Sequence, residues 1–233
     1  MGINIEKYFI NSELDQMSRY LKMVNRSWYQ EFEELDKEYK QFQESGGNDD
    51  DDGLILDDYE NRFIELGQDF PKLIFGSFVV AWYSFVEQQL LDLCEKRNLR
   101  ISLSAKESVN LSKGIWRARK FLVDIGKVKI DEKYWQELSN INRLRNFLVH
   151  EGYTLWGNYL EIEKPFVIYK SDMGENIYFT IEENLYRYLQ KYSMVTHLGT
   201  WLQIVPTIEY CEYLISFAKT MFGVLIDSSK VDN

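Results

Sequence analysis

The residues of this chain that could carry out acid–base chemistry are concentrated in one short run, Arg145-Asn146-Phe147-Leu148-Val149-His150. Histidine has an unperturbed pKa close to neutrality, so a general base working near pH 7 is expected at one of the two histidines, His150 or His197. His150 has an arginine and an amide just before it, and Arg143 adds a further positive charge. His197 has no such neighbours, and we interpret it as a structural or surface residue near a helix end.

Helical geometry decides whether the side chains of this run can act together. Asn146 lies four residues before His150 and therefore on the same helical face. Arg145 lies five residues before His150, roughly 140° away around an ideal helix. The two side chains can approach each other only if the helix bends or ends here, and Gly152 indicates such an end. The alternative is that cationic side chains only stabilise a helix C-terminus through its dipole.

Charge is distributed unevenly along the sequence. The net charge is −10, yet residues 96–150 hold 13 basic and 5 acidic side chains, whereas residues 1–70 hold 7 and 18. An acidic protein binds nucleic acid poorly because like charges repel, but a basic segment can attract a polyanion locally. The candidate substrate-binding residues are three that share a helical face and one beside the run: Lys113, Arg117, Lys120 and Arg143. The alternative is that these charges are spread over several solvated helix faces.

The elements that must position these residues are mainly helices, because apolar residues recur every three or four positions. Residues 12–44 are expected to form one long helix that Ser12 caps. The segment from Pro71, capped by Asp69, to Lys96 is apolar nearly all round and should be central. Its apolar residues are Phe75, Phe78, Val79, Trp82, Phe85, Leu90, Leu93 and Cys94. Glu87 is its one conspicuous inner charge candidate, with a solvent-facing side chain as the alternative.

The run itself belongs to a helix that Asp131 should cap. Ser104 and Glu107 fit a capping box before another helix. From Tyr159 the pattern changes, and a β-hairpin is expected at about 159–180 around the turn Ser171-Asp172-Met173-Gly174. The remaining helices are expected at residues 54–67, 104–125, 182–196 and 204–226.

Four consecutive aspartates follow the long N-terminal helix, in the segment Asn48-Asp49-Asp50-Asp51-Asp52-Gly53. Their mutual repulsion predicts a mobile loop. A calcium loop is the alternative, but the alternate spacing of ligands and the final Glu of an EF-hand are absent. We therefore expect no metal site, and we divide the chain into an N-terminal helical extension with an acidic loop, 1–53, and a helical domain, 54–233.

Arg145, Asn146 and His150 resemble the RNA-cleaving motif of the HEPN superfamily, in which four to six residues separate an Arg and a His and a polar residue often follows the Arg. The apolar helix that contains Phe85-Val86-Glu87 also resembles the first core helix of that fold. The resemblance covers roughly residues 71–226. Two features depart from it: the N-terminal extension and the hairpin at 159–180, which is an insertion into a minimal bundle of four to five helices. Some HEPN toxins carry a modifiable Tyr two residues after the His, whereas Tyr153 is three residues after His150.

The resemblance implies a metal-independent endoribonuclease. A neutral His150 would accept the proton of the 2′-hydroxyl, and a second His150, supplied across a homodimer interface, would donate a proton to the leaving 5′-oxygen. Arg145 would neutralise the negative charge on the oxygens of the phosphorane-like state, and Asn146 would orient His150 or the phosphate. Glu87 and Tyr153 are expected to support the site. The product would carry a 2′,3′-cyclic phosphate.

The resemblance also suggests toxin–antitoxin or antiviral-defence biology, with RNA as substrate, an antitoxin or other regulatory protein as a possible partner, and no cofactor. The alternative is a non-catalytic HEPN-fold module that binds RNA, nucleotide or a partner protein. The acidic first 70 residues could also cover the basic segment and restrain activity. Cys94 and Cys211 are expected to be buried reduced thiols. With neither a signal peptide nor a membrane span in the sequence, we expect a cytoplasmic protein.

Overall fold

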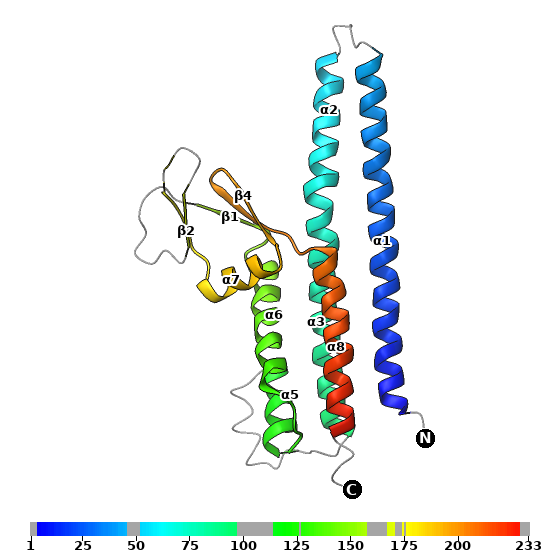
Figure 1. Ribbon diagram of the computed structural model, residues 1–233, viewed down its shortest axis with the longest axis vertical. Coiled ribbons are helices and arrows are strands. Elements are labelled where there is room, and N and C mark those ends of the chain that lie inside the picture. Colours follow the sequence, from blue (N-terminus) through cyan, green and yellow to red (C-terminus); the bar gives the residue numbers. More distant parts are fainter. Residues whose placement is uncertain are drawn as a thin grey trace. The chain divides into compact units, whose positions relative to one another are not determined.

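A computed structural model describes residues 4–45, 52–96, 114–125, 127–157, 167–170, 174 and 176–228 (Figure 1). The fold of these residues is mainly α-helical, as predicted, with two small antiparallel sheets. The helices are α1 (Ile5–Glu44), α2 (Asp52–Ile64), α3 (Phe70–Lys96), α5 (Ile115–Arg119), α6 (Glu132–His150), α7 (Glu183–Lys191) and α8 (Ile208–Ser228), with π-helical segments η1 (Glu65–Asp69) and η2 (Lys120–Ile125). The strands are β1 (Thr154–Trp156), β2 (Val167–Lys170), β3 (Asn176–Phe179), β4 (Val195–Leu198) and β5 (Trp201–Ile204).

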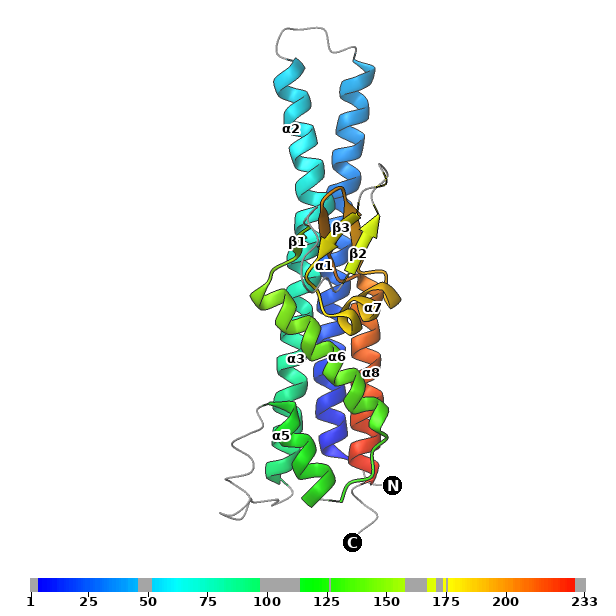
Figure 2. The same cartoon turned by 90° about the vertical axis from the view of Figure 1, so that its left-hand side faces the viewer.

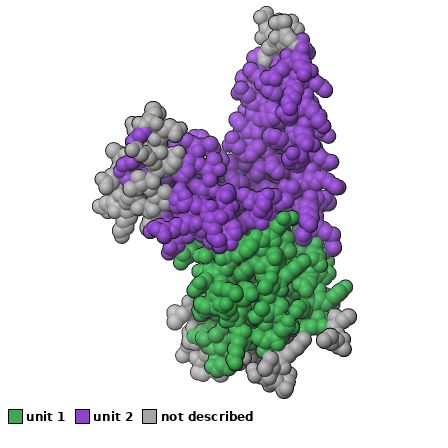
Figure 3. All heavy atoms as spheres, in the orientation of Figure 1, with its two compact units in different colours: residues 1–17, 79–152, 212–233 green, residues 18–78, 153–211 purple. Residues whose placement is uncertain are grey.

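The chain divides into two compact units, coloured separately in Figure 3. Unit 1 contains residues 1–17, 79–152 and 212–233, and unit 2 contains residues 18–78 and 153–211. Helices α1, α3 and α8 therefore contribute residues to both units. The expected boundary after residue 53 falls inside unit 2. The start of α1 belongs to unit 1, where Ile10 and Leu14 are buried, and the division of the chain after residue 53 stays a prediction.

Unit 1 is a helical bundle with an aromatic centre. Trp82 of α3 and Tyr134 of α6 both pack against Phe217 of α8, with ring centres 6.3 and 5.8 Å apart. Tyr213 of α8 donates a hydrogen bond of 2.8 Å to Glu137 of α6. Along α3, seven of the eight apolar residues expected at its centre are buried, and Phe85 is half-buried. The prediction that this helix is central is therefore confirmed.

Unit 2 contains a helical hairpin formed by α2 and by α1 from Ser18 onward, and the two helices run side by side in Figures 1 and 2. Aromatic rings fill the seam between them. Tyr59 of α2 lies 5.4 Å from Tyr39 and 5.6 Å from Phe42, and Phe63 lies 5.5 Å from Tyr39 and 5.8 Å from Phe32, measured between ring centres. The helical periodicity of residues 12–44 thus corresponds to a real contact face.

The expected break between the second and third helices does not occur, because a π-helical turn carries the chain through it. Pro71 lacks an N–H and its ring crowds the carbonyl four residues back, which normally ends a helix. Here η1 widens the helix just before the proline, and Phe70 donates to the carbonyl of Glu65 instead. Trp28 of α1 donates its indole N–H to the carbonyl of Leu66 at 2.7 Å, so this carbonyl is also satisfied.

Two predicted helix caps, Ser12 and Asp69, are wrong. The first helix begins at Ile5 rather than near Ser12. The side-chain oxygen of Asn4 caps it by accepting hydrogen bonds from the backbone N–H groups of Glu6 and Lys7. Asp69 does not cap a new helix, because the helix continues, and its carboxylate instead pairs with Lys72 at 2.9 Å. The predicted capping box at Ser104 and Glu107 lies outside the described residues.

The sheets of unit 2 were predicted only in part. The hairpin expected at 159–180 is confirmed as β2 and β3, which pair antiparallel with Val167 opposite Phe179, whereas Ser171–Met173 of its turn lie outside the described residues. The helix expected at 182–196 ends at Lys191, and β4 and β5 then form a second hairpin that β1 joins, in the order β1-β5-β4. The last helix accordingly begins at Ile208 rather than at residue 204.

Candidate active site

The run that ends in His150 forms the last turns of α6. Asp131 caps this helix by accepting a hydrogen bond from the Lys133 N–H at 3.0 Å, as predicted. The helix is regular to His150, Glu151 follows it as the C-cap, and Gly152 has a φ of +81°, which favours glycine. The predicted helix end is therefore confirmed. The residues that α6 buries are Trp135, Leu138, Ile141, Leu144, Phe147 and Leu148.

Arg145 is half-buried and is held between two neighbours. Its Nη1 donates a hydrogen bond of 2.9 Å to Oδ1 of Asn146. Its guanidinium carbon lies 6.0 Å from the centre of the Tyr83 ring, which comes from α3. Its Nε is buried and has no hydrogen-bond partner within the part of the chain that the structure describes. A planar cation resting on an aromatic face loses little further side-chain freedom when it binds an anion.

Tyr83 is the residue of this site that the sequence did not single out. It is 6% exposed, and burial raises the pKa of its phenol far above the usual value, with a further contribution from the negative charge of Glu87 and an opposing one from Arg145. The phenol therefore stays uncharged at neutral pH. A polar pair one helical turn apart within a mainly apolar stretch, Tyr83 and Glu87, is the signal that could have revealed it.

Glu87 is half-buried, not directed fully into solvent, and it lies against the start of α5. A Cβ atom placed on Gly114 would come within 2.5 Å of Oε1 of Glu87. Gly114 also has a φ of +63°, a conformation that other residues adopt only with strain. The backbone conformation thus favours glycine here, and a side chain at this position would displace the end of the flexible Glu87 side chain.

His150 lies in a different environment from Arg145. It is exposed at the end of α6, and Asn146 on the same face is exposed as well. The helix does not bend between Arg145 and His150, and the structure contains no hydrogen bond between these two described side chains. A single chain therefore presents a cation anchored on α3 and, separately, an accessible imidazole at the helix end.

The other candidate residues are not all brought into this arrangement. Arg117, Lys120 and Arg143 are half-buried, and Nε of Arg117 is buried without a hydrogen-bond partner among the described residues. Lys113 lies outside the described residues. Tyr153 belongs to unit 2, where burial raises its pKa and its ring lies so close to Gly76 of α3 that a Cβ there would overlap it.

His197 is located on strand β4, not near a helix end, which corrects the expectation from the sequence. Its Nε2 is 3.0 Å from the hydroxyl of Tyr186, and its ring packs edge-on against Phe179 with centres 5.8 Å apart. Burial lowers the pKa of this imidazole. These contacts agree with the interpretation of His197 as a structural residue.

The described residues contain no group of three or more His, Cys, Asp or Glu side chains arranged to hold a metal ion. Cys94 and Cys211 are buried, as predicted, and their thiols are not joined in a disulfide. None of the helices in the described part of the chain is long and apolar enough to cross a membrane.

Comparison of the chain with protein-family models, with curated proteins and with solved structures finds no match.

Proposed function

We propose that this chain is a metal-independent endoribonuclease of the HEPN type, with Arg145 and His150 as its catalytic residues. The observation that carries the proposal is the contrast at the end of α6. Arg145 is held ready by Tyr83 and Asn146, while His150 remains exposed one and a half turns later. One group is suited to a fixed electrostatic role on a phosphate, and the other is suited to proton transfer.

The proposed reaction begins with an exposed, neutral His150 that removes the proton from the ribose 2′-hydroxyl. The resulting oxygen attacks the adjacent phosphorus in line, and the bond to the 5′-oxygen breaks as that oxygen receives a proton. Arg145 offers guanidinium N–H donors to the phosphate oxygens, where negative charge builds up. The products are a 2′,3′-cyclic phosphate and a free 5′-hydroxyl.

The separation of the two side chains supports a site built from two copies of the chain. Arg145 and His150 are about 140° apart around a helix that is regular between them, so one copy does not direct both at the same phosphate. In a homodimer, His150 of one copy can face Arg145 of the other. The second imidazole then supplies the proton for the leaving oxygen. The biological setting we propose is toxin–antitoxin or antiviral defence.

The direct test is to incubate the full chain with structured and unstructured RNA in the presence of EDTA. We expect the wild type to cleave and to leave cyclic phosphate ends, and we expect His150→Ala to lose at least about a hundredfold in rate, as removal of a general base does. His197→Gln is the matched control, because it removes the other histidine, and it should retain activity. Equal cleavage by the wild type and His150→Ala would show that the site lies elsewhere.

A complementation experiment tests the two-copy site. Arg145→Ala and His150→Ala are each expected to be inactive alone. A mixture of the two forms heterodimers in which one intact Arg145 meets one intact His150, so a fraction of the activity should return, with water in place of the second imidazole as the proton donor to the leaving oxygen. A mixture that stays inactive, from chains shown to exchange subunits, would contradict the composite site.

The second candidate is a non-catalytic module of the same fold that binds RNA, nucleotide or a partner protein. The net charge of −10 favours it, because an acidic chain attracts RNA weakly. Under this alternative the wild type would not cleave RNA under any of the conditions above and would bind one of these ligands with an affinity that His150→Ala leaves unchanged.

A further inference from the structure

The α1–α2 hairpin of unit 2 contains an apolar surface that two helices cannot cover. In its described parts, residues 18–45 and 53–64, Leu21 and Leu35 are the two buried apolar side chains. The aromatic rings of the seam are only half-buried. At the start of α2, three consecutive apolar side chains, Leu54, Ile55 and Leu56, are 73%, 41% and 38% exposed. Contiguous exposed apolar residues are unusual on a helix that has no partner to cover them.

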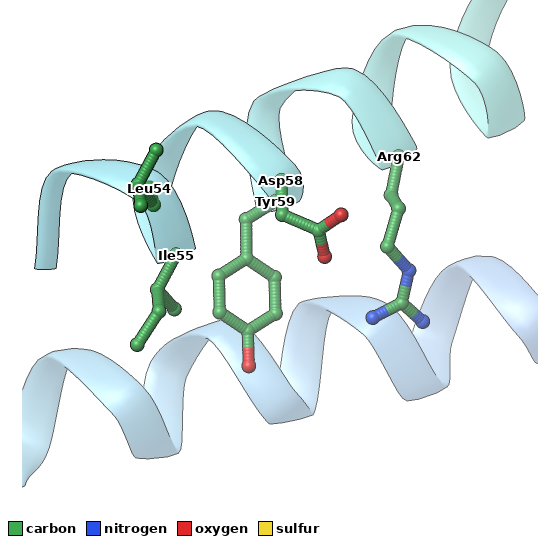
Figure 4. Close-up of a pocket in the computed structure, with 5 residues that line it drawn as sticks. All are labelled: Leu54, Ile55, Asp58, Tyr59 and Arg62. Carbon is green, nitrogen blue, oxygen red and sulfur yellow. The ribbon is translucent and has the colours of Figure 1, made fainter. Parts of the chain in front are cut away.

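These residues border a hollow in the surface of the hairpin, shown in Figure 4. Its volume is about 450 Å³, and its lining consists of Leu54, Ile55, Asp58, Tyr59 and Arg62. Ile55 and Tyr59 extend from α2 toward α1, Asp58 lies beside Tyr59, and Arg62 lies one turn further along α2. Arg62 forms an ion pair of 3.1 Å with Glu38 of α1, so the positive charge of Arg62 is balanced within the hairpin. The hollow is therefore apolar at its base and negative at its rim.

The charge of the hairpin decides what can fill this hollow. Residues 31–45 and 52–69 carry twelve acidic and three basic side chains. A second copy of the same hairpin would bring two strongly acidic surfaces together, which costs free energy. Nucleic acid and anionic membrane surfaces are repelled for the same reason. The remaining complement is a helix with an apolar stripe and positively charged flanks.

We propose that the α1–α2 hairpin is the docking site for a cationic amphipathic helix of a partner protein. The apolar stripe of that helix packs into the hollow against Leu54, Ile55 and Tyr59, as the third helix that the seam lacks. Its Lys and Arg side chains flank the stripe and face the acidic side chains of α1 and α2. This interaction does not depend on RNA cleavage, so it stands or falls separately from the proposed reaction.

The test uses the full chain and a synthetic peptide of about 20 residues, long enough to form a helix, with leucines on one face and lysines on the rest. Binding is measured by fluorescence anisotropy of labelled peptide at physiological salt. We expect this peptide to bind at least tenfold more tightly than a peptide with the same residues in scrambled order. A peptide with glutamate in place of lysine should not bind. Equal binding of the ordered and scrambled peptides would overturn the proposal, because charge alone would then explain it.

Two sets of variants locate the binding surface. The double variant Leu54→Gln and Ile55→Gln is expected to weaken peptide binding by about tenfold, because it makes the apolar base of the hollow polar. Leu73→Gln is the matched control, since Leu73 is a helical leucine that is 58% exposed on α3, outside the hairpin, and it should bind as the wild type does. If both variants bind normally, or if both lose binding equally, the hairpin is not the site.

The exposed pair Asp57→Asn and Asp58→Asn provides an independent test that does not alter apolar packing. It should weaken binding and reduce the dependence of affinity on salt, while circular dichroism remains that of the wild type. Sedimentation of the wild type and of the Leu54→Gln and Ile55→Gln double variant tests whether a second copy of the chain fills the hollow instead. If the wild type self-associates and the variant does not, the hollow is filled by a second copy, and the proposed partner helix is wrong.

Discussion

The helical bundle of unit 1 and the α1–α2 hairpin of unit 2 have the same apolar periodicity but very different burial. In the bundle, Trp82, Leu138 and Leu214 are at most 1% exposed. In the hairpin, Leu35 reaches the same burial, but the aromatic residues around it remain partly exposed. The difference lies in the number of helices that surround each apolar stripe. A stripe on a helix predicts a contact face, and only the packing of further elements turns that face into a core.

This comparison has a consequence for function. The candidate catalytic residue that needs a fixed position, Arg145, is attached to the well-packed bundle through Tyr83 of α3. The surface that we propose for a partner lies on the hairpin, where apolar side chains are still accessible. A rigid support for chemistry and an incomplete surface for recognition are thus found in different units of the chain.

The largest expected contrast is in the free energy of unfolding when a leucine is truncated in each region. Leu138→Ala in α6 removes a fully buried side chain and should destabilise the protein by about 2–5 kcal/mol. Leu54→Ala in the hairpin removes an exposed side chain and should change stability by less than about 0.5 kcal/mol. Urea unfolding followed by circular dichroism measures both values. Similar losses for the two variants would contradict the difference in packing.

Glycine substitutions sharpen the comparison at the level of the backbone. Gly114→Ala should destabilise the protein by about 1–3 kcal/mol, because the φ of Gly114 is +63° and the new Cβ would press on Glu87. Gly53→Ala in α2 has no atom near the new Cβ and should stabilise the hairpin by about 0.5–1 kcal/mol through helix propensity. Thermal unfolding compares the two.

A background variant separates the two causes at Gly114. In a Glu87→Ala chain the steric part of the Gly114→Ala penalty should disappear, while the backbone part remains. An unchanged penalty would mean that Glu87 does not approach this glycine.

The helices and the end of α6 could be predicted because each has a local cause. The periodicity of α3, the Asp131 cap and Gly152 after His150 all act within a few residues of the feature they determine. The start of α1 was misplaced because Asn4 caps it eight residues before the candidate Ser12, within a segment whose apolar residues Tyr8 and Phe9 are exposed and break the expected pattern.

What could not be predicted depends on contacts between distant segments. The continuation of the helix through Pro71 needs the π-helical turn and the indole of Trp28, which is 38 residues from its acceptor Leu66. Strands β4 and β5 are short, and the pairing of β5 with β1, which comes before α7 in the sequence, leaves little local signal. In the candidate site the sequence identified Arg145, Asn146 and His150, but Tyr83 is found only through its packing against Arg145.

The three-stranded sheet of unit 2 offers the mildest test, because His197 on β4 is only half-buried, whereas Leu202 and Ile204 of β5 are fully buried. Burial lowers the pKa of His197 in the folded protein below its ordinary value of 6.5. As the pH falls through that value, the unfolded chain takes up a proton that the folded chain does not, so the free energy of unfolding must decrease. The wild type should therefore lose thermal stability between pH 7.5 and 5.5, and His197→Gln should lose less.

His150→Gln is the control for this pH effect, because His150 is exposed at the end of α6 and its loss should leave the pH dependence of the wild type in place. If His197→Gln and the wild type lose the same thermal stability in acid, the contacts of His197 with Phe179 and Tyr186 do not lower its pKa. Solvent would then reach the imidazole on β4 even though its cross-strand neighbour Leu202 is fully buried.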